Sequence, residues 1–472
     1  MEKITFIEPK SPGFNVFNKS MSLPLMGPLY LATMAEQAGY DVQVYNENIA
    51  PVYSEKLDVI RQDVLDSDCI VITSLTSTAQ RGYKIAKAYK RDNPSGKVII
   101  GGIHATFMPY EAMKYADTVA MGEGEEILFE ALKTKEKLIQ GRPISNMNNL
   151  PTPNFSLIKN FKPKMAPVMT SRGCPYGCNF CSVTQMFGRG YRFRSTELVM
   201  KDLQAIKQKD IFFYDDHFVA NRNRTQELLT SMKESGLNKK WTAQMRVEIA
   251  NDKELLNQMA DNGCEVAYIG LESVNEETLK SYKKSQNLNY IKNAVKTLHD
   301  YGIKLHGMFV LGSDHDNAKT IKQTLEFSEV NEIDTVQYAI LTPMPGTEVY
   351  NNLNNQGRIF TKNWDLYDGL HAVFNPKLMS AYELQTKMLD AMKGFYSASK
   401  GYKLMAKNSA EATLIMIRNW FYEKKKRIPE MRNAAYKIVG SKIINKWEKT
   451  NQVYFDYLNK YRKNKDIKYN PC

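Results

Sequence analysis

The sequence predicts an α/β protein with three regions: a doubly wound parallel sheet, a partial (β/α)6 barrel and a helical C-terminal domain. Three observations predict this fold class. Apolar runs alternate with helical patterns in residues 1–144, the alternation resumes for six units in residues 165–365, and strand patterns stop at about residue 381. Apolar strands separated by helices are typical of parallel sheets covered on both faces.

The elements of residues 1–144 follow one another in βα order. The predicted strands are "KITFIEP", "DVQVYNE", "DCIVITSL", "KVIIGG" and "DTVAMGEGEE", of which the last runs into a helix. The predicted helices are "GPLYLATMAEQAGY" and "AQRGYKIAKAYKRDN". A doubly wound sheet of this kind binds its ligands beyond the carboxyl ends of its strands.

Residues 145–164 are polar and contain prolines, so we expect a linker there. Six predicted strands follow it: "KMAPVMTS", "DIFFYDD", "KWTAQMR", "EVAYIGLE", "KLHGMFVLG" and "TVQYAILT". Because a complete eightfold barrel typically needs about 250 residues, six units in about 190 residues predict an incomplete barrel.

Residues 366–472 form the predicted helical domain and carry most of the positive charge. The formal net charge is +13, and residues 401–472 hold 17 Lys and Arg against 6 Asp and Glu. The stretch "TLIMIRNWFYEKKKR" at 413–427 joins an apolar, aromatic run to four basic residues. We rank domain core first for it and peripheral membrane contact second. Nucleic acid ranks third and is not expected, because no recognised nucleic-acid module accompanies the charge.

Compartment and redox state follow from the N-terminus and the cysteines. "MEKITFIEPK" is interrupted by charges, and no later stretch approaches the roughly 18 apolar residues of a membrane span. Three of the six cysteines lie within eight positions, unlike a disulfide framework. We expect a cytoplasmic protein, with peripheral membrane contact as the open alternative, and reduced thiols. Cys69 and Cys264 are predicted core residues.

The stretch "TSRGCPYGCNFCSV" sets Cys174, Cys178 and Cys181 on the loop after the first barrel strand, where barrel enzymes keep their active sites. Three thiolates can hold three irons of a 4Fe-4S cluster, which leaves the fourth iron open to an outside ligand. The alternatives are three unrelated thiols or a zinc site completed by a distant histidine, for which His217 is the nearest candidate.

The C-x3-C-x-aromatic-C pattern resembles the signature of the radical S-adenosylmethionine (SAM) enzymes. In that family the amine and carboxylate of SAM bind the open iron, and the reduced cluster cleaves SAM to a 5′-deoxyadenosyl radical. "YIGLES", "HGMFVLG" and "LTPMPGT" resemble later motifs of the family in the same order. Arg246 suits the methionine carboxylate because of its guanidinium fork. The SAM-binding residues expected on these grounds are Phe180, Arg246, Gly270, Glu272, Ser273 and Gly312.

Two carboxylates follow the second barrel strand in "FFYDDHF". Asp215 and Asp216 could move a proton or position a substrate, so we take them as catalytic candidates. The alternative interpretation is a polar loop that caps the strand, and for His217 that interpretation is preferred.

The N-terminal region resembles the cobalamin-binding domain that is fused to one large branch of the same family. The resemblance rests on "ITSLTS", "IIGGIHAT" and "AMGEGEE", where small residues at strand ends admit a flat macrocycle and its nucleotide tail. The expected cofactor residues are Ser74, Thr76, Gly101, Gly102, His104, Gly122 and Gly124. The D-x-H-x-x-G motif that supplies a histidine below cobalt is absent. A domain that keeps the fold without the cofactor is the alternative.

The resemblance implies a radical SAM enzyme with one 4Fe-4S cluster, SAM and cobalamin. "WDLYDGLHAVFNPKLMSAYEL" resembles the subgroup containing the anaerobic magnesium-protoporphyrin ester cyclase and the hopanoid methylase. We therefore expect C-methylation of a small apolar, lipid- or tetrapyrrole-like metabolite, with flavodoxin or ferredoxin as the reductant. Radical ring closure, oxidation or carbon–carbon coupling is the second enzymatic interpretation. A non-catalytic cobalamin or iron–sulfur sensor is the interpretation from another class.

Overall fold

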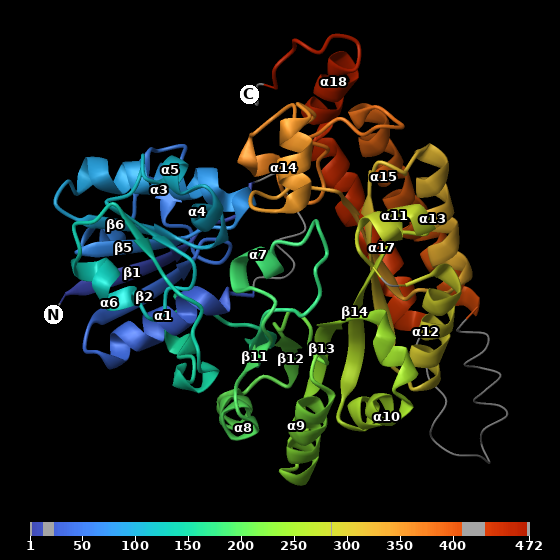
Figure 1. The fold of residues 1–472 in the computed structure, drawn as a ribbon, viewed down its shortest axis with the longest axis horizontal. Coiled ribbons are helices and arrows are strands. Elements are labelled where there is room, and N and C mark those ends of the chain that lie inside the picture. The colour runs from blue at the N-terminus through green and yellow to red at the C-terminus, as the bar shows by residue number, and fades with distance from the viewer. Residues whose placement is uncertain (1, 13–22, 285, 408–429, 470–472) are drawn as a thin grey trace.

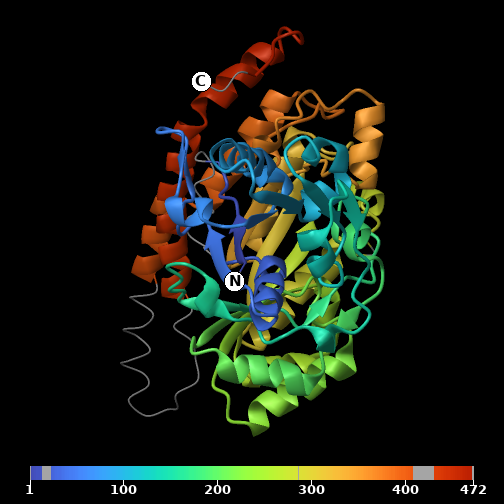
Figure 2. The same ribbon diagram turned by 90° about the vertical axis from the view of Figure 1, so that its left-hand side faces the viewer.

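The computed structural model describes residues 2–12, 23–284, 286–407 and 430–469. An N-terminal α/β domain lies beside a curved barrel sheet, and the C-terminal helices pack along the side of the barrel away from that domain (Figure 1). Turned by 90°, the N-terminal domain stands in front of the barrel strands (Figure 2). The predicted fold class is confirmed.

The N-terminal sheet is parallel throughout, with the order β2-β1-β5-β6-β7-β8. Its strands are β1 (Lys3–Glu8), β2 (Asp41–Asn46), β5 (Cys69–Thr73), β6 (Lys97–Gly101), β7 (Thr118–Met121) and β8 (Leu138–Gln140). Apolar cores lie on both faces: α1 (Met26–Gln37) and α6 (Leu128–Lys133) pack on one face and α3 (Ala79–Asp92) on the other. Short helices α2 (Gln62–Leu65), α4 (Ile103–Phe107) and α5 (Pro109–Ala112) complete the domain.

The barrel sheet is also parallel and has six strands in the order β16-β15-β14-β13-β12-β9. They are β9 (Met165–Val168), β12 (Asp210–Phe213), β13 (Lys240–Met245), β14 (Cys264–Glu272), β15 (Lys304–Leu311) and β16 (Thr335–Ile340). The helices between them are α8 (Thr196–Ala205), α9 (Arg222–Glu234), α10 (Lys253–Asp261), α11 (Glu276–Ser281), α12 (Leu288–Asp300) and α13 (Ala318–Val330). β9 and β16 are the two edges, so the barrel is incomplete.

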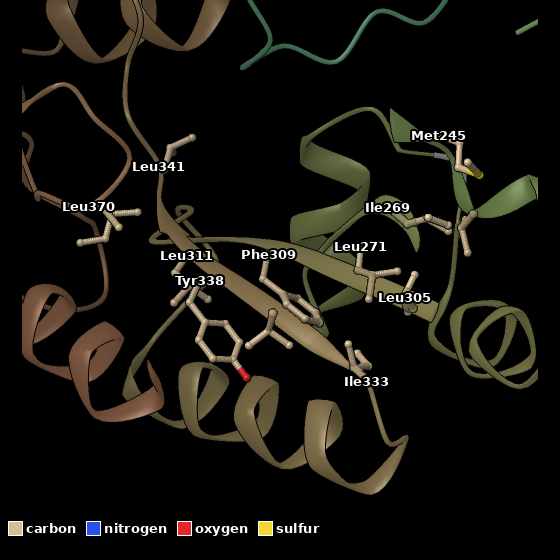
Figure 3. Close-up of a cluster of buried hydrophobic side chains, with 14 of the residues drawn as sticks. Met245, Ile269, Leu271, Leu305, Phe309, Leu311, Ile333, Tyr338, Leu341 and Leu370 are labelled. Atoms are coloured by element: carbon tan, nitrogen blue, oxygen red, sulfur yellow. The ribbon is translucent and has the colours of Figure 1, made fainter. Parts of the chain in front are cut away.

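The two faces of the barrel sheet differ in burial. Leu305, Phe309 and Leu311 of β15 point toward the helices and are 0–1% exposed, within the packed cluster of Figure 3. The residues between them, such as His306 and Met308, are partly exposed. Because successive side chains of a strand point to opposite faces, one face of the sheet is sealed and the other is open.

The segment predicted as a linker is packed against the first domain. Ile144, Met147, Leu150 and Ile158 are buried in the core beneath α1. Residues 145–164 therefore connect the two regions as a docked strap, because their apolar side chains find a surface that a sequence pattern does not reveal. The sequence also did not predict the hairpins β3 (Tyr53–Ser54) with β4 (Val59–Ile60), and β10 (Ser171–Arg172) with β11 (Arg192–Phe193).

The C-terminal region is helical in the part that the structure describes. Its helices are α14 (Glu348–Asn355), α15 (Ala381–Phe395), α17 (Glu430–Thr450) and α18 (Gln452–Tyr461). The basic stretch 413–427 lies outside the described residues. Among those residues, no helix is both long enough and apolar enough to cross a membrane.

A polar contact joins the N-terminal domain to the end of the barrel. The indole nitrogen of Trp364 donates to Glu111 Oε1 at 2.8 Å, and the Trp364 ring meets the edge of His104 at 5.1 Å between centroids. His104 also faces Thr76, at 3.4 Å from Nδ1 to Oγ1. Trp364 is 3% exposed, so this contact belongs to a closed interface.

We expect Trp364→Phe to loosen that interface. The substitution keeps an aromatic ring but removes the donor to Glu111, which we expect to lower the free energy of unfolding by about 1–2 kcal/mol. Trp241→Phe is the matched control, because Trp241 is 1% exposed and its indole donates to Asn262 within the barrel. Thermal unfolding and limited proteolysis would be compared. Faster cleavage of residues 145–164 in both variants alike would contradict the interface role.

Candidate active site

The loop after β9 carries the three predicted cysteines. Gly173 has φ +87°, and a Cβ placed there would lie 2.2 Å from the carbonyl oxygen of Gly190, so only glycine fits. Cys174, Cys178 and Cys181 are free and partly buried. The loop ends in α7 (Val183–Phe187), directly after the third cysteine.

Burial disfavours the thiolate form of two of the three cysteines. Burial raises the pKa of the Cys174 thiol and raises that of Cys181 to about 11, so ligation would have to displace protons. In the described part of the chain, no group of three or more His, Cys, Asp and Glu side chains is arranged around one ion.

Asp215 anchors the start of the cysteine loop. Its carboxylate accepts hydrogen bonds from Thr170 N at 2.7 Å, from the Ser171 hydroxyl at 2.7 Å and from the Thr170 hydroxyl. It is 0% exposed, with Arg224 at 3.8 Å. Both carboxylate oxygens of Asp215 are thus occupied by hydrogen bonds to Thr170 and Ser171. The structure therefore gives this catalytic candidate a role in positioning the start of the cysteine loop.

Asp216, the second catalytic candidate, lies differently. It accepts a hydrogen bond from Gly173 N at 2.9 Å, and it lines a cavity between the two domains. Burial raises the pKa of its carboxyl to about 6. Of the two predicted carboxylates, this one has access to a ligand.

Arg246 is occupied in the structure. Its guanidinium donates to Glu248 at 2.6 Å and stacks 3.8 Å above the centroid of Tyr176, which belongs to the cysteine loop. The pairing expected for Arg246 was with the carboxylate of SAM. To bind that carboxylate, Arg246 would have to share its N–H donors between SAM and Glu248 or break its ion pair with Glu248.

Glu272 and Gly270 lie at an irregularity of β14. Glu272 has φ +61°, and the register between β14 and β15 shifts between Gly270 and Glu272. Its carboxylate pairs with Lys284 Nζ at 2.8 Å, and both side chains are less than 10% exposed. A Cβ on Gly270 would lie 2.3 Å from the Glu272 carboxylate, so the glycine makes room for this pair.

The remaining SAM candidates differ in their surroundings. Phe180 meets Tyr282 edge-on at 4.9 Å, and Ser273 Oγ accepts from Asn275 N at 3.0 Å. Gly312 has φ +98° and donates its N–H to Asp316. Two buried polar atoms near the carboxyl ends of these strands have no partner in the structure: Tyr282 Oη and His217 Nδ1. Such unsatisfied groups fit a polar ligand like SAM, because burying them alone costs free energy.

A cavity of about 370 Å³ lies between the two domains. The carboxyl ends of β5, β6 and β7 form one wall, and residues around the cysteine loop form the other, including Met169, Arg172, Met186 and Tyr214. Ser74 lines it, while its buried hydroxyl, which has no hydrogen-bond partner, lies beside Gly82 of α3. This mainly apolar cavity fits part of a large cofactor such as cobalamin.

The predicted cobalamin residues divide into two groups. Ser74, Gly101, Gly102, Gly122 and Gly124 line the cavity, whereas Thr76 and His104 do not and face one another beside Trp364. Gly102 has φ +91°, and a Cβ there would lie 2.9 Å from the Ser74 carbonyl oxygen. Backbone conformation and packing therefore require this glycine, whether or not a cofactor approaches it.

A buried ion-pair network crosses the cavity wall between the domains. Arg172 donates to Glu123 at 3.0 Å and to Glu125 at 2.5 Å, and Arg192 also pairs with Glu123. Arg172, Glu123 and Glu125 are at most 6% exposed. In the sequence, "GEGEE" predicted a cofactor contact through its glycines alone. The signal that could have revealed the network is the pair of acidic residues there together with the arginine beside the cysteine loop.

The chain is similar to known proteins in both of its α/β regions. The Radical SAM superfamily matches residues 168–328, and the B12 binding domain matches residues 21–132. An uncharacterized methyltransferase of Pyrococcus horikoshii is 30% identical over 80% of this chain and 88% of its own length. The bacteriochlorophyllide d C-12(1)-methyltransferase of Chlorobaculum tepidum is 29% identical over 86% and 89%. The anaerobic magnesium-protoporphyrin IX monomethyl ester cyclase of Rubrivivax gelatinosus is 24% identical over 78% and 72%.

A solved structure shares the whole fold. The cobalamin-dependent SAM radical enzyme OxsB, with aqua-cobalamin bound, superposes with a TM-score of 0.66 over 98% of this chain and 81% of its own, at 13% identity. This likeness extends over both α/β regions and the C-terminal helices.

We expect Arg172→Met to destabilise the contact between the two domains and so to lower the free energy of unfolding. Removing one partner from a buried ion pair leaves uncompensated charges, which typically costs about 3–5 kcal/mol. Arg222→Met is the matched control, since Arg222 pairs with Asp252 and Glu254 on the surface, where solvent screens the charges and a much smaller loss is expected. Thermal unfolding would measure both variants. An equal loss in the two would contradict a buried network.

Asp216 predicts a pH dependence of stability in the cluster-free protein. Its folded pKa of about 6 lies above the ordinary value of 3.8, so the folded state holds an extra proton between these values and loses stability as pH rises through that window. The shift corresponds to about 2–3 kcal/mol. We expect the thermal midpoint of Asp216→Asn to rise relative to that of the wild type between pH 4.5 and pH 7.5. A difference that stays constant over this range would contradict this assignment.

Proposed function

Because the chain belongs to the radical SAM superfamily and carries a B12-binding domain, we propose that it is a cobalamin-dependent enzyme that methylates an unactivated carbon of an apolar, tetrapyrrole- or lipid-like metabolite. The family membership rests on the match to the methyltransferase of Pyrococcus horikoshii over most of both chains. The methyl transfer and the substrate class are the proposed part.

One observation carries the proposal: the cavity between the domains has a wall from each. Ser74 and Gly102 line it from the B12-binding side, and Arg172 and Asp216 line it from the side of the cysteine loop. A corrinoid held by the strand ends would therefore face the site of SAM cleavage. This arrangement suits a reaction in which a substrate radical and a methyl donor must meet.

The residues of the chain have separate tasks in this proposal. When bound, the cluster and SAM would supply a 5′-deoxyadenosyl radical and the corrinoid would supply a methyl group. Cys174, Cys178 and Cys181 would hold the cluster, and Asp215 would fix the strand end from which their loop starts. Asp216 would present its carboxyl to the cavity.

The residues proposed to surround SAM come from the barrel strands. Phe180, Arg246, Gly270, Glu272, Ser273 and Gly312 would take this role, and Lys284 would join them through its pairing with Glu272. Ser74 and the glycines at 101, 102, 122 and 124 would surround the corrinoid.

The substrate class comes from the relatives. Two of the three compared proteins act on bacteriochlorophyllide d or magnesium-protoporphyrin IX monomethyl ester, as their names state. Ring closure is the second candidate reaction, favoured by the similarity to the cyclase of Rubrivivax gelatinosus. Flavodoxin or ferredoxin is the proposed reductant. The segment considered for peripheral membrane contact lies outside the described residues, so that contact stays a prediction.

The test is anaerobic reconstitution of the full chain with iron, sulfide and hydroxocobalamin, followed by dithionite and SAM. We expect about four irons per chain and one corrinoid, with 5′-deoxyadenosine detected by mass spectrometry. Cys178→Ala should lose cluster absorbance and 5′-deoxyadenosine. Cys69→Ala, which changes a cysteine in the core of the other domain, should keep both.

The outcomes discriminate between the candidate reactions. Cleavage of SAM with stoichiometric corrinoid supports methylation, whereas cleavage without corrinoid binding favours ring closure or coupling. If no 5′-deoxyadenosine forms in the presence of a full cluster and candidate substrates, the radical function is refuted.

A further inference from the structure

Tyr176 lies in the cysteine loop between Cys174 and Cys178, and its ring stacks on a guanidinium of the barrel. The guanidinium carbon of Arg246, which directly follows β13, lies 3.8 Å from the centroid of the Tyr176 ring. Glu248 holds the edge of the same guanidinium, at 2.6 Å from Nη2 and 3.1 Å from Nε. We call Tyr176, Arg246 and Glu248 the guanidinium clamp.

The cysteine loop is also fastened to the barrel on both sides of the clamp. At the start of the loop, Gly173 N donates to Asp216 at 2.9 Å. Near its end, Asn179 Nδ2 donates to the carbonyl oxygen of Ser281 at 2.8 Å. The clamp lies between these contacts, at the residue midway between the first two cysteines. It therefore attaches the middle of the loop to the barrel, and this attachment does not require a bound cluster.

The clamp is partly shielded from water. The side chain of Arg246 is 10% exposed, whereas that of Glu248 is 34% exposed and Tyr176 is 38% exposed. A cation on an aromatic face contributes more when it is desolvated, so this stack is stronger than one on the open surface. The ring of His217 lies 5.7 Å from that of Tyr176. Burial and then the charge of Arg246 lower the pKa of His217 to about 4, so the neutral imidazole does not repel the guanidinium.

Arg246 keeps one nitrogen for a ligand while it belongs to the clamp. The stack on Tyr176 uses the flat face of the guanidinium, and Glu248 uses Nε and Nη2 at its edge. Among the described residues, Nη1 has no hydrogen-bond partner. A planar guanidinium with five donors can serve a face contact, one carboxylate and a second anion at the same time. The ion pair with Glu248 therefore does not have to break when a carboxylate binds.

We propose that Tyr176 is a positioning residue that couples the cysteine loop to the SAM site through Arg246. The stack holds the middle of the loop in the conformation that binds the cluster, and it fixes the plane of the guanidinium that would receive the carboxylate of SAM. The inference rests on the proposed function, in which Arg246 belongs to the surroundings of SAM. Loss of the Tyr176 ring should thus affect both cofactors, although the ring need not touch either.

The first test measures hydrogen–deuterium exchange of residues 174–182 in the cluster-free full chain. Tyr176→Leu and Arg246→Met should speed exchange there about two- to fivefold, as expected for the loss of one cation–π contact. Tyr176→Phe should keep the wild-type rate, because it keeps the aromatic face. Phe193→Leu is the matched control and should change nothing at 174–182. Phe193 is 41% exposed and lies 5.9 Å from the guanidinium of Arg224, but it belongs to β11 and not to the loop.

The second test uses the reconstituted chain without oxygen and measures iron loss to a chelator and SAM binding. Tyr176→Leu should lose iron about two- to fivefold faster than the wild type. It should also bind SAM about two- to fivefold more weakly, measured by equilibrium dialysis before the cluster is reduced. The double variant Tyr176→Leu/Arg246→Met should lose iron no faster than Arg246→Met alone, because the two substitutions remove the same contact.

The possible results separate the inference from the proposed function. Equal exchange and equal iron loss in Tyr176→Leu and the wild type would overturn the inference. Faster iron loss with unchanged SAM binding would overturn the coupling, as would additive effects of the two substitutions. A wild-type chain that assembles no four-iron cluster would instead refute the proposed function. Thermal midpoints within about 3 °C of the wild type confirm that the variants fold.

Discussion

The ion pairs of Arg172 with Glu123 and Glu125 connect the two α/β domains. Arg172 directly precedes the glycine that starts the cysteine loop, and the acidic residues follow β7 of the B12-binding sheet. A buried ion pair contributes little net stability, because desolvation offsets most of the attraction. The ion pair instead fixes orientation, because its hydrogen bonds form only in one relative position of the two charged partners. It therefore determines how the two walls of the cavity come together.

The strand ends supply the other half of this positioning. Asp215 ties the end of β12 to the end of β9, and the cysteine loop starts from that junction. On the opposite wall, the backbone of Ser74 lies so close to Gly102 that a side chain there would collide with it. Rigid backbone therefore surrounds the cavity on both sides, while the side chains that line it are mainly apolar. A site built this way can hold large cofactors without reorganising.

Much of this fold was predictable, because strand and helix periodicities and the cysteine spacing are local signals. The six barrel strands and five of the six parallel N-terminal strands were found from such patterns, as was the position of the cysteine loop, whereas the three-residue strand β8 was missed. Which side chains form hydrogen bonds or ion pairs with one another was not predictable. Arg246 was expected to meet a ligand, but Glu248 lies two residues away and binds it. Asp215 and Asp216 are adjacent in sequence, yet Asp215 is occupied by hydrogen bonds at the strand ends, whereas Asp216 lines the cavity. Side-chain pairings of this kind leave no periodicity, whether the partner lies two residues away or on another strand.

The division of the cavity wall between two domains has a consequence for how such proteins diversify. A B12-binding domain grafted from a relative would bring its own acidic residues to an arginine that belongs to the barrel, together with a docked strap whose apolar side chains lie in its core. We therefore expect exchange to preserve the interface only when the strap and the arginines travel with the domain. The exchanged segment would then extend into the barrel, past Arg172 and Arg192, instead of ending at the boundary between the folds.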